Sequence, residues 1–98
     1  MDLNSCTQTL TERVGTDSGL NASLKFDCGN DGIVFIDGRA APNTVDNADR
    51  EAECTVTITL ENLAAMLRGD LEPVTGFMTG RFTVAGDMSV AMRLNRVV

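Results

Sequence analysis

Apolar side chains in the first third of the chain recur at two different spacings. In residues 3–14 they fall three or four positions apart, which predicts an amphipathic helix that ends near Gly15. In residues 22–28 apolar and polar side chains alternate, which predicts a strand with one buried face. Turn residues at 29–32 then lead into the wholly apolar run 33–36, so these two strands are expected to form a hairpin.

The regular pattern is interrupted between residues 39 and 51. This region is polar, contains Pro42, and has Val45 as its one large aliphatic side chain. It is either a short edge strand, a position that tolerates proline, or an acidic surface loop. Alternation returns in residues 54–60, where β-branched side chains on both faces predict a further strand.

The spacing becomes helical after Thr59, whose hydroxyl is suited to cap the start of a helix. Apolar residues within 60–67 line one helical face, and Gly69 supplies the left-handed residue with which helices commonly end. Pro73 is suited to the first turn of a second, shorter helix, which Gly80 would end.

A strand and a helix are predicted to follow. Phe82 and Val84 alternate with polar side chains, which indicates a half-buried strand, and Gly86 interrupts it. Asp87 is a favourable N-cap for a final helix over residues 88–97. That helix is apolar on more than one side, so we expect it to have packing partners on both.

The predicted order is one helix, four strands, two helices, a fifth strand and a final helix. Because two helices separate the fourth strand from the fifth, the connection must cross over one face of the sheet. A chain of 98 residues is the size of one domain and hides roughly 65% of its unfolded surface, enough for a core without disulfides. We therefore expect an α+β fold in which residues 1–98 form a single domain.

Charge and composition exclude several classes of partner. The net charge of −6 argues against nucleic acid, whose binding depends on neutralising phosphates, and against a polybasic membrane anchor. No apolar run approaches the roughly 18 residues of a membrane span, and the first residues lack the pattern of a secretory signal. We therefore expect a cytoplasmic protein whose three cysteines are buried thiols.

The residues that usually carry catalysis or bind metals are scarce. Histidine is absent, which removes the commonest general base and metal ligand. The three cysteines form no paired motif, and Cys28 and Cys54 occupy apolar strand positions typical of core thiols. Lys25, the only lysine, follows no glycine-rich phosphate loop. The acidic cluster in residues 46–53 is interpreted as a solvated loop, so we expect no enzyme activity, cofactor or metal.

The remaining unusual feature is a set of four methionines in the last third of the chain. Met66, Met78, Met88 and Met92 fall on the faces of the last three helices that are expected to point inward. Methionine fills irregular space and adapts to different shapes, so the set is consistent with an ordinary core or with the lining of an adaptable pocket. The helical spacing alone leaves both interpretations open.

The segment from residue 69 to residue 94 contains an ordered set of glycines, helix caps and apolar residues. The set consists of Gly69, Leu71, Pro73, Phe77, Met78, Gly80, Gly86, Asp87, Met88, Ala91, Met92 and Leu94. It resembles the sterol carrier protein type two family. The resemblance extends back through residues 54–58 and, more loosely, through residues 24–27.

The resemblance implies a mixed sheet of five strands in the order 3-2-1-4-5, covered by helices. It also implies an apolar tunnel between sheet and helices that holds sterols, fatty acids, fatty acyl groups or phospholipid tails. By motif match, the residues that would line the tunnel are Phe77, Met78, Met88, Met92 and Leu94. Leu67 and Phe82 are added because each falls on the apolar face of its own predicted helix or strand.

Two departures from the family pattern are expected to matter. The N-terminal helical region is short, which indicates a smaller or more open tunnel. Gly76 stands where the family commonly has a small helix former such as alanine. Glycine there costs roughly 0.5–1 kcal/mol and is expected to loosen the turn that carries Phe77.

These observations lead to one main hypothesis and two alternatives. The chain is expected to be a non-enzymatic domain, a monomer or weak dimer, that holds or transfers an apolar lipid chain. Each buried methylene is worth about 0.8 kcal/mol and one hydrogen bond only about 1 kcal/mol, so head-group specificity should be poor. The first alternative is a structural or dimerisation module of the same fold with a filled core. The second is a small enzyme, whose sign would be acyl thioester turnover that depends on Cys54.

Overall fold

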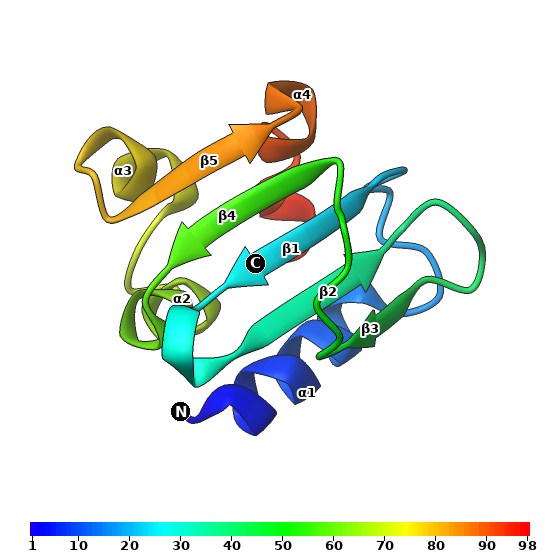
Figure 1. Cartoon of the computed structure of the whole chain (residues 1–98), viewed down its shortest axis with the longest axis horizontal. Helices are drawn as coiled ribbons and strands as arrows, with labels where there is room; N and C mark the ends of the chain where they lie inside the picture. Colours follow the sequence, from blue (N-terminus) through cyan, green and yellow to red (C-terminus); the bar gives the residue numbers. More distant parts are fainter.

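One five-stranded sheet organises the computed structural model, which describes residues 1–98. Its strands are β1 (Ser23–Asp27), β2 (Ile33–Asp37), β3 (Thr44–Asp46), β4 (Cys54–Ile58) and β5 (Phe82–Gly86). They lie in the order β3-β2-β1-β4-β5 (Figure 1). Every neighbouring pair is antiparallel except β1 and β4, which are parallel. The α+β class and the strand order implied by the family resemblance are confirmed.

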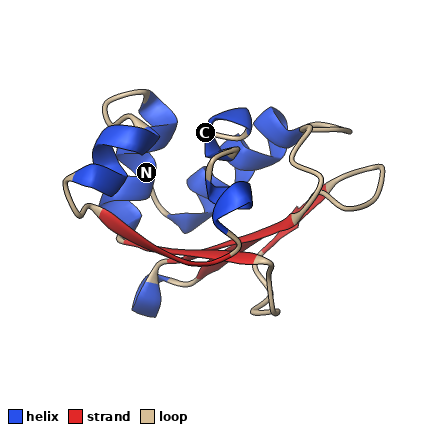
Figure 2. Cartoon of the chain, turned by 90° about the horizontal axis from the view of Figure 1, so that it is seen from above, coloured by secondary structure: helices blue, strands red, loops and turns tan.

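The α-helices lie on one side of this sheet (Figure 2). They are α1 (Leu3–Val14), α2 (Leu60–Arg68), α3 (Pro73–Met78) and α4 (Met88–Ala91), and two 3-10 helices, η1 (Gly29–Asp31) and η2 (Leu94–Arg96), complete the elements. The connection from β4 to β5 runs through α2 and α3, so it is the crossover that the order of elements predicts. None of the helices combines the length and the apolar character that crossing a bilayer would need.

Several helix ends coincide with residues that the sequence singles out. The Thr59 side chain accepts a hydrogen bond from the backbone N–H of Asn62 at 3.1 Å, which caps the start of α2. Gly69 ends α2 in the left-handed conformation, at φ 84°. The Asp87 carboxylate accepts from the backbone N–H of Ser89 at 2.9 Å and caps α4.

The C-terminal segment differs from the single helix expected over residues 88–97. After the short α4, the backbone tightens into the i→i+3 pattern of a 3-10 helix, as in the 2.9 Å bond from the N–H of Arg93 to the carbonyl of Val90. This change of pitch allows Val90, Leu94 and Val97 all to be buried. Packing against the core therefore outweighs the helical periodicity here.

The face of the sheet away from the helices is partly covered by the segment between β3 and β4. β3 is a short edge strand, and residues 47–53 then cross the sheet as a loop, so each interpretation of this region describes part of it (Figure 1). The Arg50 guanidinium lies 4.8 Å from the ring centroid of Phe35, and Lys25 Nζ lies 2.9 Å from Asp49 Oδ1. Phe35 is consequently only 1% exposed.

A cluster of 22 buried residues fills the space between the helices and the sheet. Cys6, Cys28 and Cys54 all belong to it and are free thiols. Burial raises the pKa of the Cys28 thiol to about 11 and also raises the pKa of Cys6 and of Cys54. These thiols are therefore protonated core groups at neutral pH.

Candidate functional site

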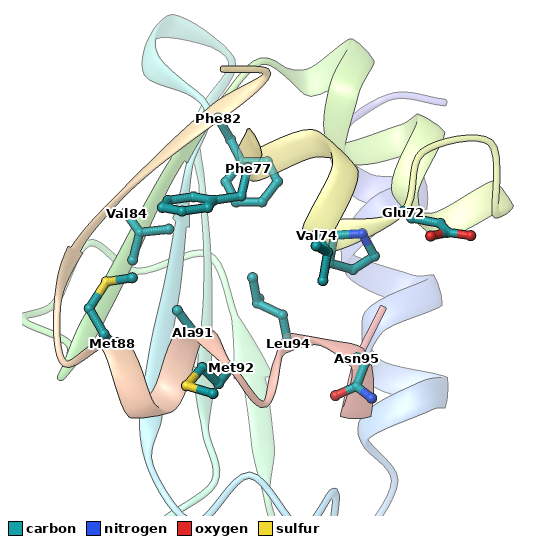
Figure 3. Close-up of a pocket in the computed structure, with 11 residues that line it drawn as sticks. Glu72, Val74, Phe77, Phe82, Val84, Met88, Ala91, Met92, Leu94 and Asn95 are labelled. Atoms are coloured by element: carbon teal, nitrogen blue, oxygen red, sulfur yellow. The ribbon is translucent and has the colours of Figure 1, made fainter. Parts of the chain in front are cut away.

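An apolar pocket of about 450 Å³ lies where β5, α3 and α4 meet (Figure 3). Of the eleven residues that line it, eight are hydrophobic. The lining consists of Glu72, Pro73, Val74, Phe77, Phe82, Val84, Met88, Ala91, Met92, Leu94 and Asn95. All of these residues come from one stretch of the chain, so local sequence determines the pocket.

The first wall is the short helix α3, which begins with Pro73 in its first turn. Val74 and Phe77, three positions apart, share the helical face that borders the pocket. Gly76 is buried, and a Cβ built on it would lie 2.7 Å from Cε2 of Phe82. The missing side chain therefore lets α3 lie directly against β5, a packing role that the sequence did not indicate; the loosening of this turn stays a prediction.

The floor of the pocket is β5. Phe82 is only 4% exposed, and its ring centroid lies 6.1 Å from that of Phe77 with the planes tilted by 45°. Aromatic pairs attract at this separation, so the two rings hold α3 to the strand. Phe82 pairs with Ile58 of β4, and Val84 pairs with Val56, which makes the floor continuous with the main core.

The second wall is formed by α4 and η2. Leu94 is 3% exposed, whereas Met88 is 48% and Met92 82% exposed. The hydroxyl and the backbone N–H of Ser89 donate to the Asp87 carboxylate at 2.6 and 2.9 Å, fix the start of α4, and hold the pKa of Asp87 below its usual range. The pocket is thus closed by the core at Leu94 and open to solvent at the two methionines.

Comparison with known families shows which family the chain belongs to. The model of the SCP-2 sterol transfer family matches residues 15–98. The chain belongs to this family. Sterol carrier protein 2 of Gallus gallus is 35% identical over 51 residues, which cover 52% of the chain and 9% of that relative. The chain therefore spans less than a tenth of the length of this relative.

Solved structures related to the SCP-2 sterol transfer family share the fold. Sterol Carrier Protein 2 Like 2 from Aedes aegypti superposes with a TM-score of 0.73 at 18% identity, over 98% of the chain and 99% of that structure. The palmitated form of the Aedes aegypti protein gives a TM-score of 0.67 at 18% identity, over 99% of the chain and 94% of that structure. At this identity the likeness shows a common fold.

Five of the seven residues assigned by sequence to a tunnel of this SCP-2 family domain line the pocket. They are Phe77, Phe82, Met88, Met92 and Leu94. Leu67 is instead 2% exposed and belongs to the main core. Met78 is 79% exposed and lies outside the lining, because it follows Phe77 on a helix whose successive side chains point about 100° apart. Contact of any of these residues with a ligand stays a prediction.

The four late methionines do not all face inward as the helical spacing predicts. Met66 is 3% exposed, but Met78, Met88 and Met92 are each roughly half exposed or more. The reason is the position of β5 at the edge of the sheet. No further element packs beyond it, so the outer sides of α3 and α4 face solvent.

Some lining residues were not assigned by sequence. Val74 lies one helical turn before Phe77, and Val84 lies two positions after Phe82 on the same face of its strand. The helical spacing of α3 and the alternation of β5 are both visible in the sequence and could have identified these two residues. Asn95 lies three positions after Met92 and shares the helical spacing of Met88, Ala91 and Met92, whereas Glu72 carried no such signal.

The lining can desolvate an apolar group and offers little else. Glu72 and Asn95, its two most polar residues, are exposed, and the Glu72 side chain makes no capping bond to α3. None of the three thiols lines the pocket. No group of three or more potential metal ligands lies together in the structure. Removal of hydrocarbon from water is the chemistry that this arrangement supports.

Proposed function

We propose that the pocket between β5, α3 and α4 binds the hydrocarbon part of a lipid without chemical change. The candidates are a sterol, a fatty acid, a fatty acyl group or a phospholipid tail. Membership of the SCP-2 sterol transfer family indicates lipid binding. The Aedes aegypti neighbour has a palmitated form, which supports an acyl chain as one candidate.

The single observation that carries this proposal is the apolar lining of a pocket of about 450 Å³. Sites for small molecules commonly measure roughly 300–1,000 Å³ and are lined mainly by hydrophobic and aromatic side chains. In a protein of ordinary hydrophobic content, such a surface left open to solvent is unfavourable unless it has an occupant.

Burial of hydrocarbon dominates the expected affinity. About ten buried methylenes contribute on the order of 8 kcal/mol, from which ordering costs of several kcal/mol are subtracted. A single hydrogen bond to a head group adds only about 1 kcal/mol. The protein should therefore bind several lipid classes with similar affinity.

The pocket is proposed to act as an open groove rather than a closed tunnel. Val74 is 69% and Met92 82% exposed, so one side of a bound chain would stay near solvent. The flexible methionine side chains could fold over a guest of variable shape. This geometry favours exchange of ligand over long retention.

The proposal is tested by titrating the delipidated protein with a fluorescent fatty acid and by native mass spectrometry of freshly purified protein. We expect saturable binding at micromolar levels or tighter. Met92→Glu places a charge at the opening of the pocket and should weaken binding roughly five- to tenfold, because a carboxylate disfavours adjacent hydrocarbon.

Met78→Glu is the matched control. Met78 is 79% exposed, close to the 82% of Met92, but lies outside the lining. It should leave the affinity for the fatty acid unchanged. Failure of every long-chain lipid tested to bind would contradict the proposed function.

The alternative is a structural or dimerisation module of the same fold. The tightly packed cluster of 22 buried residues is the feature in its favour. A stable dimer in solution, together with no binding of lipid, would support this reading. We also propose that residues 1–98 act as one domain, a monomer or weak dimer, in the cytoplasm.

A further inference from the structure

The two edge strands of the sheet are protected to different degrees. At one edge, the short strand β3 packs against α1. At the other edge, β5 has five residues and no strand lies beyond it (Figure 1). Thr83, Ala85 and Gly86 are exposed, and none of the five strand residues carries a charge. Natural sheets usually protect such an edge, so β5 is a candidate to accept a further strand.

The register of β5 shows which of its backbone groups face outward. The N–H of Asp87 donates to the carbonyl of Glu53 at 2.7 Å, so these two residues form a hydrogen-bonded pair of the antiparallel ladder. Such pairs alternate with non-hydrogen-bonded pairs, so Val84 directs its N–H and its carbonyl away from β4. Phe82 has the same direction but is only 4% exposed. The accessible part of the edge is therefore short and centred on Val84.

Opposite charges lie at equal distances from this centre. Arg81 lies three residues before Val84, and Asp87 lies three residues after it. Both residues are exposed, and neither belongs to any of the four ion pairs of the structure. The Asp87 carboxylate accepts from Ser89 through Oδ1 alone, which leaves Oδ2 for a further partner.

We propose that β5 pairs with β5 of a second copy of the chain, about a two-fold axis at Val84. Two-fold symmetry makes the two strands antiparallel, so Arg81 of each copy lies opposite Asp87 of the other. This is a non-hydrogen-bonded position, where facing Cα atoms come within about 4.5 Å and the side chains are closest. The dimer therefore gains two cross-strand ion pairs.

The helices on either side of β5 in the sequence fit the same symmetry. Because α3 precedes β5 and α4 follows it, the two helices lie towards opposite ends of the strand (Figure 1). Their exposed large apolar side chains are Val74, Phe77, Met78, Met88 and Met92. The two-fold axis brings α3 of one copy towards α4 of the other, so these side chains can be buried between the copies. A contiguous group of exposed apolar side chains is typical of an interaction surface.

Other occupants suit this edge less well. An anionic membrane would meet Glu72, the one charged residue of the pocket lining. A peptide from another protein could make the backbone bonds, but the placement of Arg81 and Asp87 about Val84 is complementary to itself. Because the accessible edge is short, the interface is small, and the dimer should be weak and reversible.

Sedimentation velocity over a series of protein concentrations tests this interface. We expect a reversible equilibrium between monomer and dimer. Arg81→Glu makes both cross-strand pairs acidic, and Asp87→Lys makes both of them basic. Each change should raise the dissociation constant of the dimer about tenfold, because two exposed ion pairs are lost and two repulsions replace them.

An equimolar mixture of these two variants tests the register itself. In the mixed dimer both cross-strand pairs again join opposite charges, so association should return close to that of the natural chain. Asp87→Lys also removes the cap of α4. Asp87→Asn keeps a capping side chain and should weaken association about threefold.

Arg39→Glu is the control for Arg81→Glu, because it changes the net charge by the same amount. Arg39 is exposed and lies far from β5 in the sheet order, beside Asp37 at the end of β2, with Nη2 and Oδ2 3.0 Å apart. Its replacement should leave the dissociation constant unchanged.

Three results would overturn the proposed dimer. They are a monomer at every concentration reached, a dimer that Arg81→Glu leaves unchanged, and a mixture of the two variants that fails to recover association. The proposed lipid function is tested separately, because Arg81 does not line the pocket. Arg81→Glu should therefore lose the dimer and keep the affinity for the fatty acid.

Discussion

Gly76 lies so close to the ring of Phe82 that any side chain there would have to displace it. A Cβ would come within 2.7 Å of Cε2 of Phe82 and 3.4 Å of Cδ2 of Leu71. The ring cannot easily retreat, because it packs against Phe77 and is almost wholly buried. At this residue, packing has a larger effect than helix propensity.

Replacement of Gly76 by alanine tests this balance. Overpacking costs roughly 1–3 kcal/mol and exceeds the gain in helix propensity of about 0.5–1 kcal/mol. Gly76→Ala should therefore lower the free energy of unfolding by about 1 kcal/mol in urea denaturation. In a Phe82→Leu background, where the ring is absent, the same change should be neutral or stabilising. Stabilisation in both backgrounds would show that the close approach is unimportant.

At the scale of elements, alternation and helix caps predict most of the fold. The alternation in residues 22–28 and 54–60 becomes β1 and β4, and Thr59 begins α2 as its position predicts. Periodicity identifies the face that an element buries. It does not show whether another element covers the opposite face, which is why the 82% exposure of Met92 could not be predicted. The division of the final helix depends on tertiary packing in the same way.

The cap of α4 has a predictable dependence on pH. The hydrogen bonds from Ser89 lower the pKa of Asp87 in the folded protein below its ordinary value. The ionised carboxylate therefore stabilises the folded state above about pH 4, and this contribution is lost as the pH falls through the lowered pKa. Thermal melts should show Asp87→Ala to be less stable than the natural chain at pH 7, and the difference should shrink towards pH 2. A difference that is the same at every pH would assign the effect to something other than the carboxylate charge.

On the scale of the whole molecule, the main core and the pocket between β5, α3 and α4 differ in their access to solvent. The main core contains all three thiols, each no more than 7% exposed, whereas the pocket at the edge of the sheet is open to solvent. The family fold of five strands was predictable from the ordered residues between Gly69 and Leu94. The opening of the pocket was not, because it depends on how far α3 and α4 extend beyond β5.

The closed core predicts unreactive thiols. With the pKa of Cys28 raised from 9.0 to about 11, its thiolate fraction at pH 8 is roughly a hundredth of that of a free thiol. Ellman's reagent should react with all three cysteines only after denaturant is added. Thr75→Cys, at an exposed position of α3, supplies a control thiol that should react at once in the folded protein. Rapid labelling of the natural chain without denaturant would mean that the core opens frequently.

All the residues that line the pocket fall between Glu72 and Asn95, a single uninterrupted segment that follows the first four strands. Most binding sites draw on several distant parts of a sequence, so a change of specificity requires coordinated changes in each. Here a single segment holds every lining residue, so an exchange of residues 72–95 with those of a homologue would replace the entire lining at once. Such a swap would change the whole lining of the pocket while β1 to β4 keep their original sequence, and only the core residues that the segment itself supplies, such as Phe82 and Leu94, would change with it.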